Sequence, residues 1–212
     1  MSKTGTRIFI VDDDAKFRKS LTRLVRSIGY DVELFSSAKD FLEREPFDGT
    51  SCLLLDVRMP GLTGPDLQEE LKKRNISIPI IFLTAHGDTP TGVKAMKDGA
   101  VDFLLKPFEE RALFEAIDKA LDKDVQYKKK LKEINETKRL VATLTSRELE
   151  VFRWLITGML NKQIAWNLKI TERTVKAHRS QIMHKLDVVS VAELVRIAQK
   201  ADISPARESP RL

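Results

Sequence analysis

Short runs of apolar residues alternate with segments of helical spacing through the first 121 residues. The apolar runs, each typical of a short buried strand, are RIFIV at 7–11, VELF at 32–35, CLLLD at 52–56, IPIIFLTA at 78–85 and VDFLL at 101–105. In the segments between them apolar residues recur every three or four positions, which predicts helices over 14–28, 38–45, 65–74, 89–98 and 108–121. Five repeats of strand and helix predict a parallel sheet covered by helices on both faces.

The pattern changes after residue 121. Residues 122–143 contain no Gly or Pro and are heavily charged, with a thin apolar stripe at Leu131 and Ile134. We expect a solvated helical linker here, which can be continuous with the helix before it, and the stripe leaves a short coiled-coil contact open. Residues 144–200 are again periodic but have no strand signal, and we expect residues 204–212, SPARESPRL, to be a disordered tail.

Three helices are predicted in this second periodic segment. The first is capped by Thr145 or Ser146, together with Glu148, and ends near Thr157. The second covers 162–168 after a cap at Asn161, and the third covers 172–186 after a cap at Thr171. The close spacing of the last two indicates a helix-turn-helix.

Composition narrows the class of protein. No apolar run approaches the roughly 18–20 residues that span a bilayer, and no cleavable signal is evident, so we expect a cytoplasmic protein. The single cysteine, Cys52, excludes an intrachain disulfide and is read as a buried apolar residue.

The net charge of +6 is unevenly distributed along the chain: residues 1–120 carry 18 Lys and Arg against 20 Asp and Glu, whereas residues 121–212 carry 19 against 11. The basic second part suggests nucleic acid as its partner.

Charged and polar residues follow four of the five predicted strands. Strand one ends in Asp12, Asp13 and Asp14, strand three in Asp56, strand four in Thr84 and strand five in Lys106. Parallel strands lie about 4.8 Å apart, so neighbouring strands would bring several carboxylates together, and a cation must then offset their repulsion. Oxygen ligands at an open edge suit Mg²⁺. A carboxylate nucleophile, a divalent ion, a hydroxyl and an ammonium together indicate phosphoryl chemistry.

Residues 5–121 resemble the receiver domain of two-component response regulators, a flavodoxin-like, doubly wound α/β fold. The motifs that carry the resemblance are IFIVDDD, LLLDVRMPGLTG, LTAHGD and GAVDFLLKPF. The resemblance implies that Asp56 accepts a phosphoryl group from a sensor histidine kinase. It implies that Asp13, Asp56 and the backbone carbonyl of Arg58 ligate Mg²⁺, with Asp12 assisting through water.

The same resemblance assigns further roles in the first domain. Thr84 and Lys106 would bind the phosphoryl oxygens, and the Lys106–Pro107 bond matches a position that is often cis. Thr84 would also act in a switch with Phe103, the aromatic residue of strand five. Phe103 can equally be a structural core residue.

Residues 144–203 resemble the LuxR-type DNA-binding domain of regulators of the NarL/FixJ class. The matching motifs are LTSRELEV, NKQIAWNL and ITERTVKAHRSQIMHKL, and DVRMPGLTG together with LNKQIAW favours the FixJ-like subgroup. The resemblance implies a four-helix, all-α unit whose last helix, about 191–200, makes dimer contacts. It places Lys176, Ala177 and Ser180 at the bases. The residues implied in phosphate contacts or support of the fold are Lys162, Thr174, His178 and Arg179. His178 can equally be a packed structural residue.

These patterns predict a transcription regulator rather than an enzyme that turns over an external substrate. The receiver would catalyse only its own phosphotransfer and dephosphorylation, and phosphorylation would favour a dimer that binds promoter DNA. RNA polymerase is a further candidate partner. Two alternatives stay open: a phosphatase that uses Asp56 as its nucleophile, and a regulator whose receiver acts without phosphate. Arg58 in place of a second carboxylate disfavours the first, and the complete set of strand-end residues disfavours the second.

Overall fold

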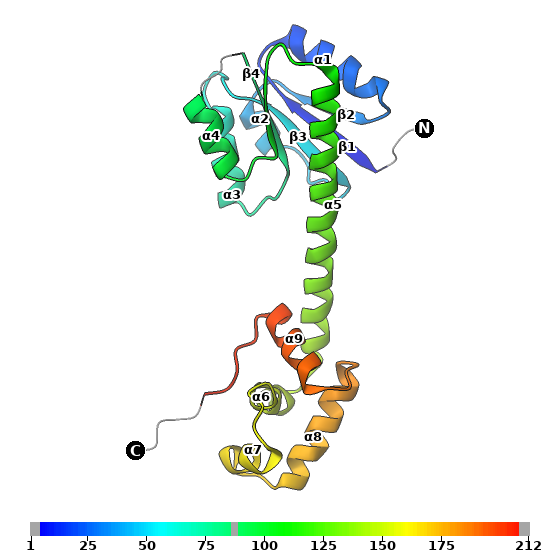
Figure 1. The fold of residues 1–212 in the computed structure, drawn as a ribbon, viewed down its shortest axis with the longest axis vertical. Helices are drawn as coiled ribbons and strands as arrows, with labels where there is room; N and C mark the ends of the chain where they lie inside the picture. The colour runs from blue at the N-terminus through cyan, green and yellow to red at the C-terminus, as the bar shows by residue number, and fades with distance from the viewer. Residues whose placement is uncertain (1–4, 86–88, 208–212) are drawn as a thin grey trace. The chain divides into compact units, whose positions relative to one another are not determined.

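A computed structural model of the chain describes residues 5–85 and 89–207, and shows an α/β unit and a helical unit. The chain divides into these two compact units between Lys128 and Lys129, within helix α5. The fold class expected from the sequence, a doubly wound receiver fold with a small all-α domain, is confirmed (Figure 1).

Five parallel strands form the sheet of the first unit in the order β2-β1-β3-β4-β5. They are β1 (Thr6–Val11), β2 (Asp31–Phe35), β3 (Thr50–Asp56), β4 (Ile80–Thr84) and β5 (Asp102–Leu105). Because β2 and β3 lie on opposite sides of β1, the strand order reverses between β1 and β3. In open parallel sheets a ligand site lies beyond the carboxyl ends of the strands at such a reversal.

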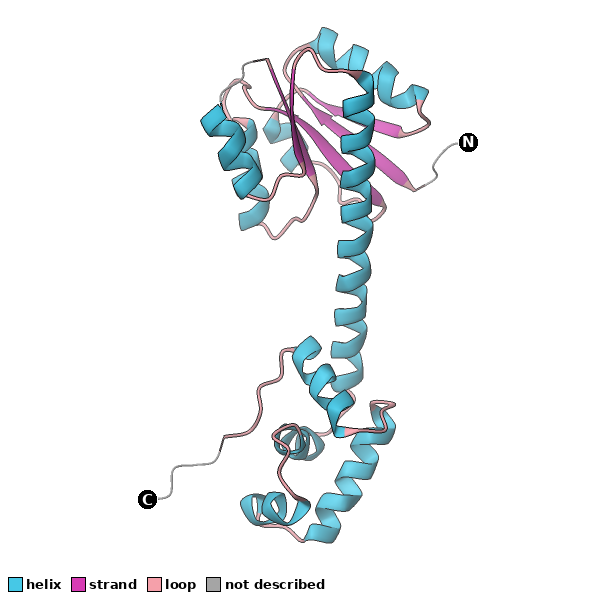
Figure 2. Ribbon diagram, in the orientation of Figure 1, coloured by secondary structure: helices cyan, strands magenta, loops and turns pink. Residues whose placement is uncertain are grey.

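Helices cover both faces of this sheet, as Figure 2 shows. They are α1 (Ala15–Ser27), α2 (Ala38–Leu42), α3 (Gly64–Lys73), α4 (Thr89–Lys97) and α5 (Glu110–Val141). Successive strand residues alternate between two cores. Ile8 and Ile10 join the core under α1 and α5, whereas Phe9 and Val11 join the core under α2, α3 and α4.

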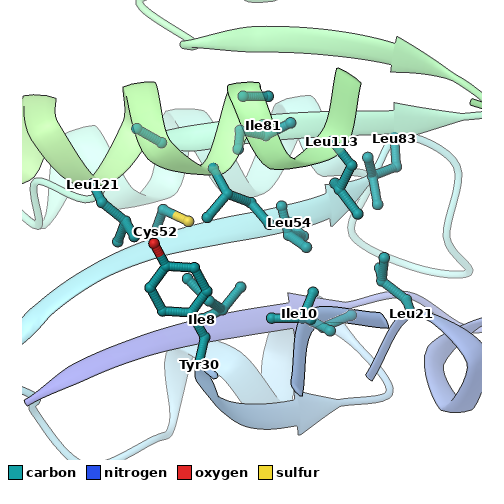
Figure 3. Close-up of a cluster of buried hydrophobic side chains, with 14 of the residues drawn as sticks. Ile8, Ile10, Leu21, Tyr30, Cys52, Leu54, Ile81, Leu83, Leu113 and Leu121 are labelled. Atoms are coloured by element: carbon teal, nitrogen blue, oxygen red, sulfur yellow. The ribbon is translucent and has the colours of Figure 1, made fainter. Parts of the chain in front are cut away.

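The core under α1 and α5 holds the sheet against the long helix (Figure 3). Leu113 and Leu121 of α5 lie over Leu54 and Cys52 of β3, and all four are buried. Burial raises the pKa of the Cys52 thiol far above its usual range, so this residue behaves as the apolar core residue expected from the sequence.

The α5 helix continues beyond the first unit, so the charged segment 122–143 is helical to Val141 and continuous with the fifth helix. Asp124 lies on its buried side, with 1% of its surface exposed. One oxygen of its carboxylate accepts hydrogen bonds from the Ser51 N–H at 2.9 Å and from Lys128 Nζ at 2.7 Å. These contacts attach α5 to the first residues of β3.

The second unit contains α6 (Ser146–Leu155), α7 (Asn161–Leu168), α8 (Glu172–Lys185) and α9 (Val191–Ala201) around one core. Thr145 and Thr171 cap α6 and α8 as expected. The N-cap expected at Asn161 is wrong. Leu160 is the N-cap of α7, so the helix begins one residue before the predicted start, and the Gln163 side chain accepts a hydrogen bond from the Leu160 N–H. Asp187 follows α8 with φ +50°, a conformation that glycine adopts at lower cost.

The first residues of the expected tail contact the second unit. The Ala206 N–H donates to the Arg153 carbonyl at 3.0 Å, and the Ala206 side chain packs against the core. Residues 208–212 lie outside the described residues. Across the part of the chain that the structure describes, no helix is both long enough and apolar enough to cross a membrane.

Candidate functional site

A pocket of about 300 Å³ opens at the carboxyl ends of the strands, where the strand order reverses. It is lined by Asp12, Asp13, Asp14, Phe17, Asp56, Arg58, Thr84, Ala85 and Lys106. The four strand-end groups that the sequence singled out therefore lie around one pocket. The pairing of β1 with β3 brings Asp12 beside Asp56, and this pairing is the condition on which the expected convergence of carboxylates depended.

Lys106 joins the two buried carboxylates of this pocket. Its Nζ atom lies 2.6 Å from Asp12 Oδ2 and 2.6 Å from Asp56 Oδ1. Asp12 and Asp56 retain only 1% and 7% of their surface exposed, so the two negative charges would repel strongly without this ammonium. The peptide bond from Lys106 to Pro107 is cis.

The environment of Asp56 is fixed by the turn after β3. The Arg58 N–H donates to Asp56 Oδ2 at 2.7 Å, while Oδ1 accepts from Lys106. Burial raises the pKa of Asp56 above its usual value, and the hydrogen bond and charge of Lys106 oppose that rise. Asp56 thus lies at a pocket wall with its carboxylate held in one orientation, which is what a nucleophile at this position would require.

The remaining acidic residues differ in their environments. Asp13 is exposed at the mouth of the pocket, whereas Asp14 caps α1 by accepting from the Lys16 and Phe17 N–H groups. Those two backbone hydrogen bonds lower the pKa of Asp14. Within 5–85 and 89–207, no three His, Cys, Asp or Glu side chains are arranged so that they alone would hold a metal ion. The ammonium of Lys106 stands between the two buried carboxylates.

Thr84 and Phe103 lie on adjacent strands. Thr84, at the end of β4, is 2% exposed and lines the pocket. Phe103 of β5 is half-buried and packs against the core under α2, α3 and α4, with its ring centroid 6.3 Å from that of Phe82. A β-carbon at Gly92 of α4 would be 3.4 Å from the Phe103 ring, so this ring packs closely beneath α4.

Two contacts at the pocket do not follow from the pattern of the sequence. The Phe17 ring lies with its centroid 3.8 Å from Lys106 Nζ, a cation–π contact, although its position fits the helical spacing of α1. Arg18 donates to the backbone carbonyl of Asp12. The sequence gives one sign of these contacts: Phe17 and Arg18 follow the acidic run by about one helical turn, so they lie at the start of the helix that leaves the strand end.

The candidate nucleic-acid interface lies on α7 and α8. Lys176, Ala177 and Ser180 are exposed on α8, while Val175 and Ile182 on its other side are buried. Lys162 is exposed on α7. Lys176 pairs with Glu172 at 3.0 Å across one helical turn. The three α8 residues expected at the bases therefore share a solvent-facing side of the helix.

The other residues expected at this interface have more enclosed environments. Thr174 joins the cap of α8, with its hydroxyl 2.8 Å from that of Thr171. His178 and Arg179 are half-buried, and the buried His178 Nδ1 has no hydrogen-bond partner among the described residues. The environment of His178 fits the structural alternative better than a fully exposed contact.

Known proteins resemble the chain over nearly its whole length. Residues 8–118 match the family described as response regulator receiver domain, and residues 142–198 match bacterial regulatory proteins of the luxR family. Nodulation protein W of Bradyrhizobium diazoefficiens is 45% identical over 203 residues, which cover 96% of this chain and 89% of that protein.

Two solved structures extend the likeness. The response regulator StyR has 46% identity and a TM-score of 0.78, covering 92% of this chain and 98% of that chain. Full-length FixJ from B. japonicum has 40% identity and a TM-score of 0.58, covering 96% of this chain and 99% of that chain.

Proposed function

The chain belongs to the response regulators that join a receiver domain to a LuxR-type DNA-binding domain, and we propose that phosphorylation of Asp56 controls its binding to DNA. The donor would be a sensor histidine kinase. The phosphorylated receiver would favour a homodimer that binds two half-sites in a promoter and acts on transcription in the cytoplasm. The single observation that carries this proposal is the pair of contacts from Lys106 to Asp12 and Asp56 inside the strand-end pocket.

The pocket suits transfer of a phosphoryl group to a carboxylate. A carboxylate oxygen of Asp56 would form a bond to phosphorus as the bond from phosphorus to the donor's histidine nitrogen breaks, and that nitrogen keeps the electron pair. Lys106 would then move its hydrogen bond from Asp56 to a phosphoryl oxygen, which balances the added charge of about −1.5 to −2. The Thr84 hydroxyl, on the same pocket wall, would bind a second oxygen.

The donor atoms of the pocket fit Mg²⁺. Mg²⁺ keeps several waters and needs only one or two protein carboxylates, so a cluster of three side chains is not required. Asp13, Asp56 and the Arg58 carbonyl would hold the ion, with Asp12 reached through water. When bound, the ion would neutralise charge on the transferring phosphoryl oxygens.

A change at Thr84 can reach α4 through Phe103. Thr84 and Phe103 belong to the paired strands β4 and β5, and Phe103 packs beneath Gly92 of α4. A phosphoryl group that draws Thr84 toward it would open space that the Phe103 ring can fill. This local change would shift the receiver between two states and so expose a dimer surface or release the DNA-binding domain.

The second unit would read DNA with the exposed side of α8. Lys176, Ala177 and Ser180 would face bases in the major groove. Lys162, Thr174, His178 and Arg179 would contact phosphates or support the fold, and the half-buried environment of His178 favours support of the fold. The proposed domain limits are 5–121 for the receiver, 122–143 for the linker and 144–203 for the DNA-binding domain. RNA polymerase is a further proposed partner.

The test is the site of phosphorylation. Incubation with a small phosphodonor and Mg²⁺ is expected to add one phosphoryl group, detected by intact mass and lost on treatment with hydroxylamine, which cleaves acyl phosphates. Asp56→Asn is expected to gain none. Asp31→Asn, at the exposed amino end of β2, is the matched control and is expected to react like wild type. Equal modification of Asp56→Asn, or none of wild type, would contradict the proposal.

A further inference from the structure

Trp166 is the most exposed aromatic side chain of the second unit's described part, with 81% of its surface accessible. It lies on α7, where its neighbours Ile164 and Ala165 are buried in the core. With most of its surface accessible, Trp166 contributes little to the packing of its own domain. Single exposed apolar side chains are common on protein surfaces, so the side chains around Trp166 decide whether it belongs to a binding surface.

Basic residues flank Trp166 along the chain. Lys162, four positions before it, lies on the same side of α7. Lys169, three positions after it, follows the last helical residue as the left-handed C-cap. Both lysines are exposed. No Asp or Glu occurs between Glu150 and Glu172, so this face carries positive charge with no carboxylate from its own segment. A polyanion complements it.

The position of α7 indicates which polyanion. The α7 and α8 helices pack on one core as a helix-turn-helix pair. When the second helix of such a pair enters the major groove, the first helix crosses the DNA backbone. Lysine ammonium groups and neutral N–H donors both bind phosphate oxygens, and the indole of tryptophan carries one such donor.

We infer that Trp166, together with Lys162 and Lys169, binds the sugar–phosphate backbone of duplex DNA beside the groove that α8 enters. The contact is independent of base sequence. Trp166 and Lys169 are thereby added to the residues of the α8 surface as contacts to the DNA backbone. The inference rests on the proposed DNA-binding function. A protein partner is the competing occupant: an apolar docking surface would combine Trp166 with Leu160, which is 71% exposed at the start of α7, and would need both side chains.

The test measures binding of the full chain to a short duplex of arbitrary sequence across a range of salt concentrations. Trp166→Ala is expected to weaken binding by about threefold to tenfold, as the loss of one neutral hydrogen bond does. The slope of log K against log salt is expected to stay unchanged, because the indole releases no counterion. Lys169→Gln is expected to weaken binding and to reduce that slope by about 0.9, the share of one phosphate.

Leu160→Ala is the matched control for lost apolar surface and is expected to bind like wild type. Trp166 also gives a direct optical readout, since the only other tryptophan, Trp154, is 8% exposed. DNA is expected to protect wild-type fluorescence from acrylamide quenching. Trp166→Phe, which retains only Trp154, is expected to show no such protection.

Three results would overturn the inference. One is Trp166→Ala binding with wild-type affinity, the second is an equal loss in Leu160→Ala, and the third is an unprotected Trp166. Circular dichroism and denaturant unfolding of each variant identify any loss that comes from misfolding. If wild type binds no duplex at all, the proposed DNA-binding function fails as well, and this outcome differs from a wild type that binds while Trp166 has no effect.

Discussion

The charge of one lysine determines the electrostatics of the strand-end pocket. Lys106 is the shared hydrogen-bond donor to Asp12 and Asp56, and Phe17 contacts its ammonium from the side. Removal of the Lys106 ammonium is expected to cost about 3–5 kcal/mol, because both carboxylates would stay buried without compensation. Removal of Asp56 differs, because Lys106 keeps Asp12 as its partner.

The raised pKa of Asp56 gives a pH prediction with a definite sign. A carboxyl whose pKa is higher in the folded chain stabilises the fold below its unfolded value of 3.8 and loses that contribution as pH rises through the folded pKa. Asp56→Asn, which stays neutral, is therefore expected to raise the Tm at pH 7. The gain is expected to shrink as the pH approaches 3.8. Differential scanning calorimetry at several pH values measures the Tm change of Asp56→Asn, with Asp31→Asn as the control. A lower Tm of Asp56→Asn than of wild type at pH 7 would contradict this prediction.

A second prediction at this scale concerns the end of α8. Asp187 has φ +50°, which costs a residue with a β-carbon roughly 1–2 kcal/mol relative to glycine. Asp187→Gly is expected to stabilise the second unit by about 1 kcal/mol, and Asp187→Ala is expected not to. Both tryptophans, Trp154 and Trp166, lie in this unit, so their fluorescence during urea unfolding reports on it. Equal changes in stability for Asp187→Gly and Asp187→Ala would show that the effect comes from the lost charge and not from the backbone conformation.

At the scale of elements, α5 is tied to the sheet by a buried charge. Asp124 accepts from the Ser51 N–H and Lys128, and Lys128 also donates to the Gly49 carbonyl at 2.6 Å. Asp124→Ala would leave a buried N–H and an ammonium without this acceptor. We expect it to destabilise the first unit by about 3 kcal/mol.

Asp122→Ala is the control for the Asp124 prediction, since Asp122 is exposed on the same helix and should change stability by no more than about 0.5 kcal/mol. Urea unfolding followed by far-ultraviolet circular dichroism compares the two variants. Similar stabilities for Asp122→Ala and Asp124→Ala would show that the contacts at the start of β3 do not hold α5.

Most elements followed from the spacing of apolar residues, because strands with both faces covered give unbroken apolar runs. The strand-end groups could be predicted to share one edge of the sheet because the strands are parallel, whereas the adjacency of Asp12 and Asp56 depends on the strand order. Three features could not be predicted. The start of α7 depends on a hydrogen bond from the Leu160 N–H to the Gln163 side chain, and the burial of Asp124 depends on its packing against β3. The contact of Phe17 with Lys106 joins side chains that are far apart in the sequence.

At the scale of the whole molecule, the two units differ in charge as their proposed roles require. The near-neutral first part holds the pocket, and the basic second part presents α7 and α8. Moving a two-state receiver from mostly inactive to mostly active takes about 5.5 kcal/mol of differential binding. A phosphoryl group on Asp56 would make charge-assisted hydrogen bonds with Lys106 and Thr84 and an ion contact with a divalent cation, and under the proposal these contacts would supply such a bias.

The central claim is that phosphorylation of Asp56 controls dimerisation and DNA binding. It is tested by light scattering and by binding to a DNA site selected from a random pool, for wild type and Asp56→Ala, each with and without a phosphodonor and Mg²⁺. We expect a dimer and tighter DNA binding only in phosphorylated wild type. Equal mass and equally tight binding in all four samples would contradict the claim, and would indicate a regulator whose receiver acts without phosphate.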